Sequence, residues 1–196
     1  MILVGVDLDN TIIHYDQLAY DLGVEEDLIP IETPARKNAV RDLIRQDHGD
    51  IVWQKIQGKL YGTALEHAQP FPNVLDFFRL LRSQNMGVVI VSHKTELAHH
   101  DPEKTNLRDA AIHWLTMNGL LGEHKHQIKR TDIYFGITRE AKIRHITTLG
   151  CHHFIDDLPE ILGHPMFPKD TVKILFDPND ENEDRSEFKR VRSWLD

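Results

Sequence analysis

Two aspartates near the start of the chain, Asp7 and Asp9, are the first side chains that could do chemistry. They directly follow the apolar run ILVGV at residues 2–6. On a strand, residues two apart face the same side, which would place the two carboxylates about 6–7 Å apart. Like charges at that distance repel, so the pair needs a nearby cation or a shared proton. Asp-Asn-Thr at residues 9–11 is also typical of turns and helix N-caps, and this segment alone leaves that interpretation open.

Other polar residues stand near the ends of later apolar runs. They are Ser92, Lys142 and the pair Asp156 and Asp157. Each has a simpler explanation, because a serine can cap a helix, a lysine is usually solvated, and two aspartates can form a turn.

The elements that would position these residues are five short apolar runs, each bounded by polar residues or glycine. Such runs are typical of strands buried on both faces of a parallel sheet. They cover residues 2–6, 87–91, 132–137, 152–155 and 172–176. Helical spacing of apolar residues falls between them and after them, at residues 72–84, 106–118, 139–149 and 186–195. This alternation predicts an α/β fold with a Rossmann-like, doubly wound parallel sheet.

The parallel topology brings the carboxyl ends of the strands to one edge of the sheet. One site would then hold two pairs of carboxylates, a hydroxyl group and an ammonium group. Carboxylate oxygens are ligands that suit Mg²⁺, and a hydroxyl beside a lysine suits a phosphate group. The sequence therefore predicts Mg²⁺ as cofactor and a phosphorylated ligand.

Residues 15–70 interrupt the alternation of strands and helices. This stretch of about 55 residues is far longer than an ordinary loop between a strand and a helix. It has helical patterns at 34–47 and 50–67, a predicted loop at 23–33, and prolines at both ends. We interpret residues 15–70 as a small α-helical cap and residues 1–14 and 71–196 as the catalytic core. The basic residues of the cap are expected to be solvated, namely Arg36, Lys37, Arg41, Lys55 and Lys59.

In order and type, these residues resemble the four motifs of the haloacid dehalogenase (HAD) superfamily, which consists mostly of phosphatases. Asp7-Leu8-Asp9-Asn10-Thr11 matches the first motif, Ser92 the second, Lys142 the third and Asp156-Asp157 the fourth. The resemblance spans residues 2–157 and implies the family's core with an inserted helical cap.

The resemblance implies a Mg²⁺-dependent phosphatase that hydrolyses a small phosphate monoester, such as a sugar phosphate or a nucleotide-like metabolite. Asp7 would be the nucleophile that forms an aspartyl-phosphate, and Asp9 the general acid and base. Asp157 is the favoured direct metal ligand. The implied metal ligands are Asp7, Asp9 through its backbone carbonyl, Asp157 and Asp156. The implied phosphate-binding groups are Ser92, Lys142 and the backbone N–H groups near Leu8 and His93.

Three other functions remain open. A phosphomutase or phosphotransferase would use the same aspartyl-phosphate with a different acceptor. A phospho-receiver switch would use it without turnover, although the helical insertion has no role there. A silent binding protein is disfavoured because all the acidic residues are present.

Charge and composition limit the partners. With 23 basic and 31 acidic residues the net charge is −8, which argues against nucleic acid or an anionic membrane as the main partner. No apolar run approaches the roughly 20 residues of a membrane span. One cysteine and no recognisable leader predict a cytoplasmic protein. The oligomeric state and the role of the polar segment 93–106 are not predicted.

Overall fold

The computed structural model describes residues 1–98, 100–101, 103–182 and 187–196. The chain forms two compact units. The first consists of residues 1–13, 70–94 and 116–196, and the second of residues 14–69 and 95–115. Among the described residues, no helix has both the length and the apolar character that crossing a membrane requires.

A six-stranded, all-parallel sheet forms the centre of the first unit, in the order β5-β4-β1-β6-β7-β8. The five strands predicted from the sequence are confirmed. The strands are β1 (Leu3–Val6), β4 (Gly87–His93), β5 (Ile133–Gly136), β6 (His153–Asp156), β7 (Val172–Phe176) and β8 (Lys189–Val191).

The helix predicted for residues 186–195 is wrong wherever the structure describes this segment, and residue 186 itself lies outside the described residues. Residues 189–191 form β8 instead, pairing with Ile174–Phe176 of β7. The apolar residues of this tail follow a helical spacing in the sequence. The free edge of β7, however, offers backbone hydrogen bonds that satisfy an extended segment.

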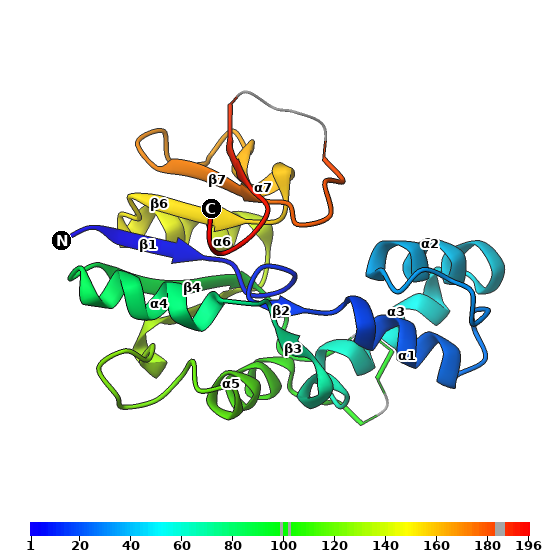
Figure 1. The fold of residues 1–196 in the computed structure, drawn as a ribbon. Coiled ribbons are helices and arrows are strands. Elements are labelled where there is room, and N and C mark those ends of the chain that lie inside the picture. Colours follow the sequence, from blue (N-terminus) through cyan, green and yellow to red (C-terminus); the bar gives the residue numbers. More distant parts are fainter. Residues whose placement is uncertain (99, 102, 183–186) are drawn as a thin grey trace. The chain divides into compact units, whose positions relative to one another are not determined.

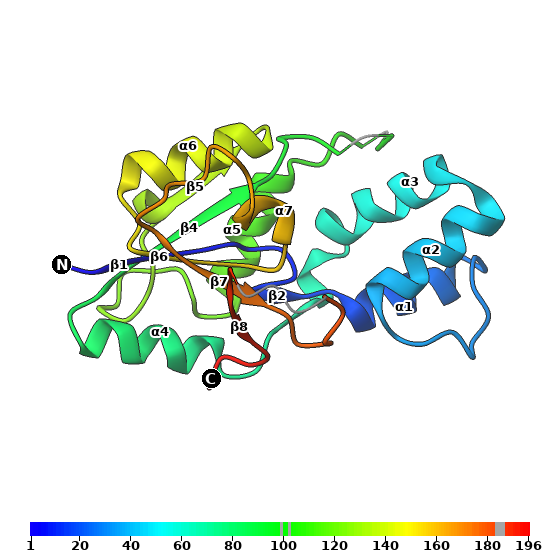
Figure 2. The same cartoon turned by 90° about the horizontal axis from the view of Figure 1, so that it is seen from above.

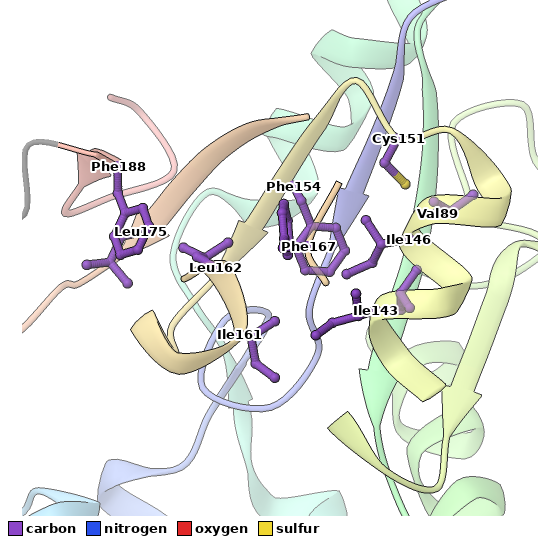
Figure 3. Packing of buried hydrophobic residues seen from close by; sticks show 11 residues of the cluster. Val89, Ile143, Ile146, Cys151, Phe154, Ile161, Leu162, Phe167, Leu175 and Phe188 are labelled. Carbon is purple, nitrogen blue, oxygen red and sulfur yellow. The ribbon is translucent and has the colours of Figure 1, made fainter. Parts of the chain in front are cut away.

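Helices cover both faces of the sheet, which confirms the predicted doubly wound architecture (Figures 1 and 2). Helix α4 (Val74–Ser83) lies on one face, and α6 (Arg139–Leu149) lies on the other. The short helix α7 (Pro159–Leu162), which was not predicted, packs with α6 over a continuous apolar cluster (Figure 3). Phe154 on β6 lies at the centre of this cluster and is fully buried.

The C-terminal tail packs on the face of the sheet that α4 covers. Trp194 is 6% exposed, and its ring lies 5.0 Å from that of Phe77 on α4 and 5.3 Å from that of Phe176 on β7. Its indole N–H donates to the carbonyl of Thr11 at 3.2 Å. The tail is therefore part of the core and also contacts the loop that follows β1.

The second unit is helical. It contains α1 (Asp16–Glu25), α2 (Lys37–His48), α3 (Asp50–Tyr61), the 3₁₀ helix η1 (Leu65–His67) and α5 (Leu107–Met117), which extends into residues 116–117 of the first unit. The two-residue strands β2 (Ile13–His14) and β3 (Gln69–Pro70) pair where the chain passes between the units. The loop predicted from Gly23 is wrong at its start, because α1 continues to Glu25. The assignment of residues 15–70 as a cap stays a prediction, and the unit that contains them also includes residues 95–115.

Candidate active site

Asp7 is the first residue after β1 and is held at the centre of the sheet. Its backbone N–H donates to the carbonyl of Ile155 on the neighbouring strand β6 at 2.9 Å, which continues the ladder by one residue. The side chain is 4% exposed. Burial disfavours the charged carboxylate and, with the negative charges of Asp156 and Asp9, raises the pKa of Asp7 to about 7, although the ammonium of Lys142 opposes this shift.

The ammonium group of Lys142 is a cation that offsets the negative charge of Asp7. Its Nζ atom donates to Asp7 Oδ1 and Asp156 Oδ2, each at 2.6 Å, and the side chain is 2% exposed. Burial favours the neutral amine, but the two carboxylates outweigh it and raise the pKa of Lys142 above its ordinary value. The lysine therefore stays charged and links β1 to β6.

The sequence around Lys142 explains why the first turn of α6 lies close enough to the sheet for this contact. Thr138 is the N-cap of α6, and its side chain accepts a hydrogen bond from the N–H of Ala141 at 3.1 Å. A Cβ atom added at Gly136 would lie 2.5 Å from the backbone nitrogen of Lys142. Only glycine lets the first turn of α6 approach β5 this closely.

Asp156 and Asp157 end β6 as predicted, and the structure brings both to Asp7. Asp156 is fully buried and accepts from the N–H of Leu158 at 3.0 Å as well as from Lys142. Asp157 accepts from Asn10 Nδ2 at 3.3 Å and from Thr11 Oγ1 at 3.4 Å. Asn10 has a φ of 59°, a left-handed conformation that asparagine tolerates, and it turns the loop after β1 toward Asp157.

The three carboxylates fit a small divalent cation. Asp7, Asp156 and Asp157 each offer an oxygen, and these atoms lie within 4.8 Å of one another. Mg²⁺ binds oxygens at about 2.1 Å, so that opposite ligands lie about 4.2 Å apart. The donor set is all oxygen, as Mg²⁺ prefers. The carboxylate of Asp9 is not one of these three, and its backbone carbonyl as a metal ligand stays a prediction.

Asp9 instead contacts a lysine that sequence reasoning missed. The Nζ atom of Lys94 lies 2.9 Å from Asp9 Oδ2 and 3.1 Å from Asp9 Oδ1. Lys94 is 3% exposed, which is rare for a lysine. The only signal in the sequence was its place two residues after Ser92, and lysine in a polar segment is ordinarily solvated.

Ser92 has an unsatisfied hydroxyl group. It lies on β4 beside β1 and is 1% exposed, and among the described residues its Oγ atom is buried with no hydrogen-bond partner. A buried polar atom without a partner is costly, so it points to a ligand that the hydroxyl would bind.

The other two predicted phosphate-binding positions differ from each other. Leu8 is fully buried, and its carbonyl accepts from the N–H groups of Ile12 and Ile13, which fixes the loop after β1. His93 is exposed at the end of β4, and its Nε2 atom lies 3.2 Å from the carbonyl of Ile137. Partial burial lowers the pKa of His93, which favours a neutral ring.

In the second unit, the prediction of a solvated Lys37 is wrong. Lys37 is 9% exposed, and its Nζ atom donates to the hydroxyl of Tyr61 at 2.6 Å. It also lies over the rings of Tyr15 and Tyr61, at 5.2 and 5.0 Å from their centroids. Aromatic faces stabilise a buried ammonium, which the periodicity of α2 did not reveal. The other basic residues of this insertion are exposed or half-buried, as predicted.

Solved structures resemble this chain in fold at low sequence identity. No family model and no curated protein sequence matches it. Among solved structures, a HAD hydrolase of family IA, variant 3, from Entamoeba histolytica aligns with a TM-score of 0.61 and 12% identity, covering 100% of this chain and 94% of that one. YfnB from Bacillus subtilis, described as a HAD-hydrolase bound to magnesium, aligns with a TM-score of 0.58 and 14% identity over 99% and 95% of the two chains.

A dehalogenase with an intermediate complex aligns with a TM-score of 0.57 and 10% identity over 100% and 94% of the two chains. These alignments span both units, and so include the strand ends with Asp7 and Asp156 and the helix α6 with Lys142. They confirm the resemblance that the four motifs indicated, at the level of the fold. The chain therefore has the fold of the HAD-superfamily hydrolases.

Proposed function

We propose that this protein is a Mg²⁺-dependent phosphatase that hydrolyses small-molecule phosphate monoesters through an aspartyl-phosphate on Asp7. The observation that carries the proposal is the setting of the Asp7 carboxylate. It is buried 2.6 Å from Lys142, and its ligand oxygen lies within 4.8 Å of those of Asp156 and Asp157. A carboxylate, a cation and a metal-ligand set in one place are what in-line attack on phosphorus requires.

In the first step of the proposed reaction, the Asp7 carboxylate attacks phosphorus and the bond to the leaving oxygen breaks. Asp9 gives its proton to that oxygen. In the second step, water attacks the phosphorus of the aspartyl-phosphate, Asp9 takes the proton of the water, and phosphate and Asp7 are released. The first step leaves Asp7 phosphorylated and Asp9 deprotonated, and the second step restores both residues, so the full cycle is balanced.

The remaining residues act on the charge of the phosphoryl group. The Ser92 hydroxyl, which is buried without a partner among the described residues, and the Lys142 ammonium would bind phosphoryl oxygens. The backbone N–H groups near Leu8 and His93 would complete this set. Asp7, Asp156, Asp157 and the Asp9 carbonyl would hold Mg²⁺, which when bound neutralises phosphoryl charge and orients the substrate.

Asp9 favours phosphate chemistry among the reactions that this fold supports. A dehalogenase with an intermediate complex shares the fold, so the fold alone does not choose the reaction. A leaving alkoxide needs a proton donor, and Asp9 supplies a carboxyl group for that purpose two residues after the nucleophile. The magnesium bound to the similar YfnB structure supports Mg²⁺ as the cofactor.

The proposal assigns residues 15–70 to a cap that closes over the substrate, with residues 1–14 and 71–196 as the core. Closure excludes water from the reaction and favours small substrates over polymers. The net charge of −8 also favours a small metabolite over nucleic acid.

The proposal is tested by phosphate release from a panel of phosphorylated sugars and nucleotides, with Mg²⁺ or with EDTA. We expect release with Mg²⁺ only, and a loss of at least about 10³-fold in kcat for Asp7→Asn because the nucleophile is removed. Asp170→Asn, at an exposed position of the same unit, is the matched control and should keep full activity.

Three outcomes would contradict the proposal. Full activity in Asp7→Asn would exclude Asp7 as the nucleophile. Stable labelling of Asp7 without turnover would indicate a phospho-receiver switch. Transfer of the phosphoryl group to a second metabolite in place of water would indicate a phosphotransferase or mutase.

A further inference from the structure

Lys94 forms a buried ion pair with Asp9 at the site, and the proposed reaction gives Lys94 itself no role. Removing an ammonium from water is costly unless charged and hydrogen-bonding partners replace the lost hydration. Two apolar side chains of similar size would fill the same space at lower cost. The Lys94 side chain is 2% exposed and that of Asp9 15%, so the pair is largely shielded from solvent.

Lys94 is anchored at both ends. Its backbone N–H donates to the carbonyl of Gly136 on β5 at 3.0 Å. At the other end, Nζ contacts both oxygens of the Asp9 carboxylate, at 2.9 and 3.1 Å. Contacts to both oxygens restrict the rotation of the carboxylate, which a contact to one oxygen would not do.

The position of this contact matters for the proposed reaction. Asp9 is two residues from Asp7, and Lys94 is two residues from Ser92. Each carboxylate oxygen has two lone-pair directions, so an oxygen that contacts Lys94 can still meet a leaving oxygen or a water. General acid catalysis requires this oxygen to be within hydrogen-bond reach of the proton's destination.

We propose that Lys94 is a positioning residue that fixes the orientation of the Asp9 carboxylate toward the leaving oxygen. This inference rests on the proposed function, because it gives Asp9 its role as proton donor. Lys94 itself is not assigned to the substrate: it acts through Asp9, from the strand end that also carries Ser92.

The test is a double-mutant cycle with Lys94→Met and Asp9→Asn, measured on two substrates with Mg²⁺. An alkyl phosphate has a poor leaving group and depends on Asp9, whereas p-nitrophenyl phosphate has a good leaving group and depends on it less. We expect Lys94→Met to lower kcat about 100-fold on the alkyl phosphate and less than about tenfold on p-nitrophenyl phosphate. KM should change less than about threefold.

The decisive comparison is made in the Asp9→Asn background. There Lys94→Met should change kcat less than about twofold, because the carboxylate on which Lys94 acts is absent. Equal losses in both backgrounds would overturn the proposal. A raised KM with unchanged kcat would also overturn it and would indicate direct binding of the substrate by Lys94. Lys125→Met, an exposed lysine of the same unit, is the matched control.

Loss of folding is separated from loss of positioning by a second variant. Lys94→Met leaves the Asp9 carboxylate without its ammonium, and circular dichroism and thermal unfolding report whether the protein still folds. If it does not, Lys94→Gln, which keeps an N–H donor, enters the same cycle with the same expected coupling. A wild-type protein inactive on the whole panel would refute the proposed function, whereas an active wild type with additive losses would refute only the role of Lys94.

Discussion

At the scale of single residues, the site is a set of opposite charges on buried or partly buried side chains. Lys142 lies 2.6 Å from both Asp7 and Asp156, and Lys94 lies 2.9 Å from Asp9. Four carboxylates at the strand ends, from Asp7, Asp9, Asp156 and Asp157, are matched by two ammonium groups. The remaining negative charge suits a divalent cation, which agrees with the oxygen ligands that three of these carboxylates offer.

The raised pKa of Asp7 predicts how the metal-free protein responds to pH. Folding raises the pKa of Asp7 from its ordinary value of 3.8 to about 7, so the folded state binds the Asp7 proton more tightly than the unfolded state. The stability that this proton contributes is present below about pH 4 and is lost as pH rises to about 7. The side-chain amide of Asp7→Asn cannot ionise, so this variant lacks that loss. In EDTA, its free energy of unfolding should therefore increase relative to that of wild type as pH rises from about 4 to about 7.

Urea unfolding of both proteins in EDTA at a series of pH values measures this difference. The contributions of the other titratable groups cancel to a first approximation when the two proteins are compared at each pH. A difference that stays constant from pH 4 to 7 would show that Asp7 titrates normally.

At the scale of elements, the C-terminal tail stabilises the loop that carries the site residues. Trp194 packs on Phe77, Phe78 and Phe176 and donates a hydrogen bond to the carbonyl of Thr11. Thr11 in turn donates to Asp157 at 3.4 Å. The tail strand β8 therefore brings an aromatic anchor to the loop between β1 and β2.

We expect Trp194→Phe to lower the free energy of unfolding by about 1 kcal/mol, because it removes mainly the hydrogen bond to Thr11. Trp194→Ala should cost about 3–5 kcal/mol, because it also leaves a cavity among the aromatic rings. Equilibrium urea unfolding measures both values. Leu195→Ala is the control, since Leu195 is 75% exposed, and a loss there equal to that of Trp194→Ala would contradict this account.

At the scale of the whole molecule, the chain builds its second unit from two separate segments. Trp114 on α5 is 1% exposed, and its indole N–H donates to the carbonyl of Ala68 at 2.9 Å. This bond joins residues 95–115 to residues 14–69. The second unit therefore depends on a segment more than twenty residues beyond the insertion, which the Pro-bounded stretch 15–70 did not indicate.

We expect Trp114→Ala to destabilise the second unit by about 3–5 kcal/mol, because a large buried side chain is removed. Relative to wild type, this variant should exchange amide hydrogens faster in α1 to α3, and the acceleration should be smaller in β1, β4 and β6. Equal acceleration in both units would show that they unfold as one. Ile51→Ala, at a residue 58% exposed on α3, is the control and should change exchange little.

Much of the fold and of the candidate site could be predicted from the local order of residues. Apolar runs of strand length identified β1, β4, β5, β6 and β7, because strands buried on both faces need continuous apolar sequence. The polar residues at their ends then had to meet at one sheet edge. Asp7, Ser92, Asp156 and Asp157 were singled out in this way, and Lys142 by its place in the helix before the last acidic pair; the structure brings both acids of the fourth motif to Asp7.

Only the tertiary structure decided which charged side chains are buried and which segment pairs with the edge of β7. Lys37 was predicted to be solvated and Lys94 was not singled out, because burial depends on partners that lie far away along the chain, such as Asp9 for Lys94 and Tyr61 for Lys37. The tail at residues 189–191 has a helical pattern but forms β8, because the open edge of β7 offers it hydrogen bonds. Local sequence thus determined the strands and their polar ends, whereas long-range pairing determined the charge balance of the site.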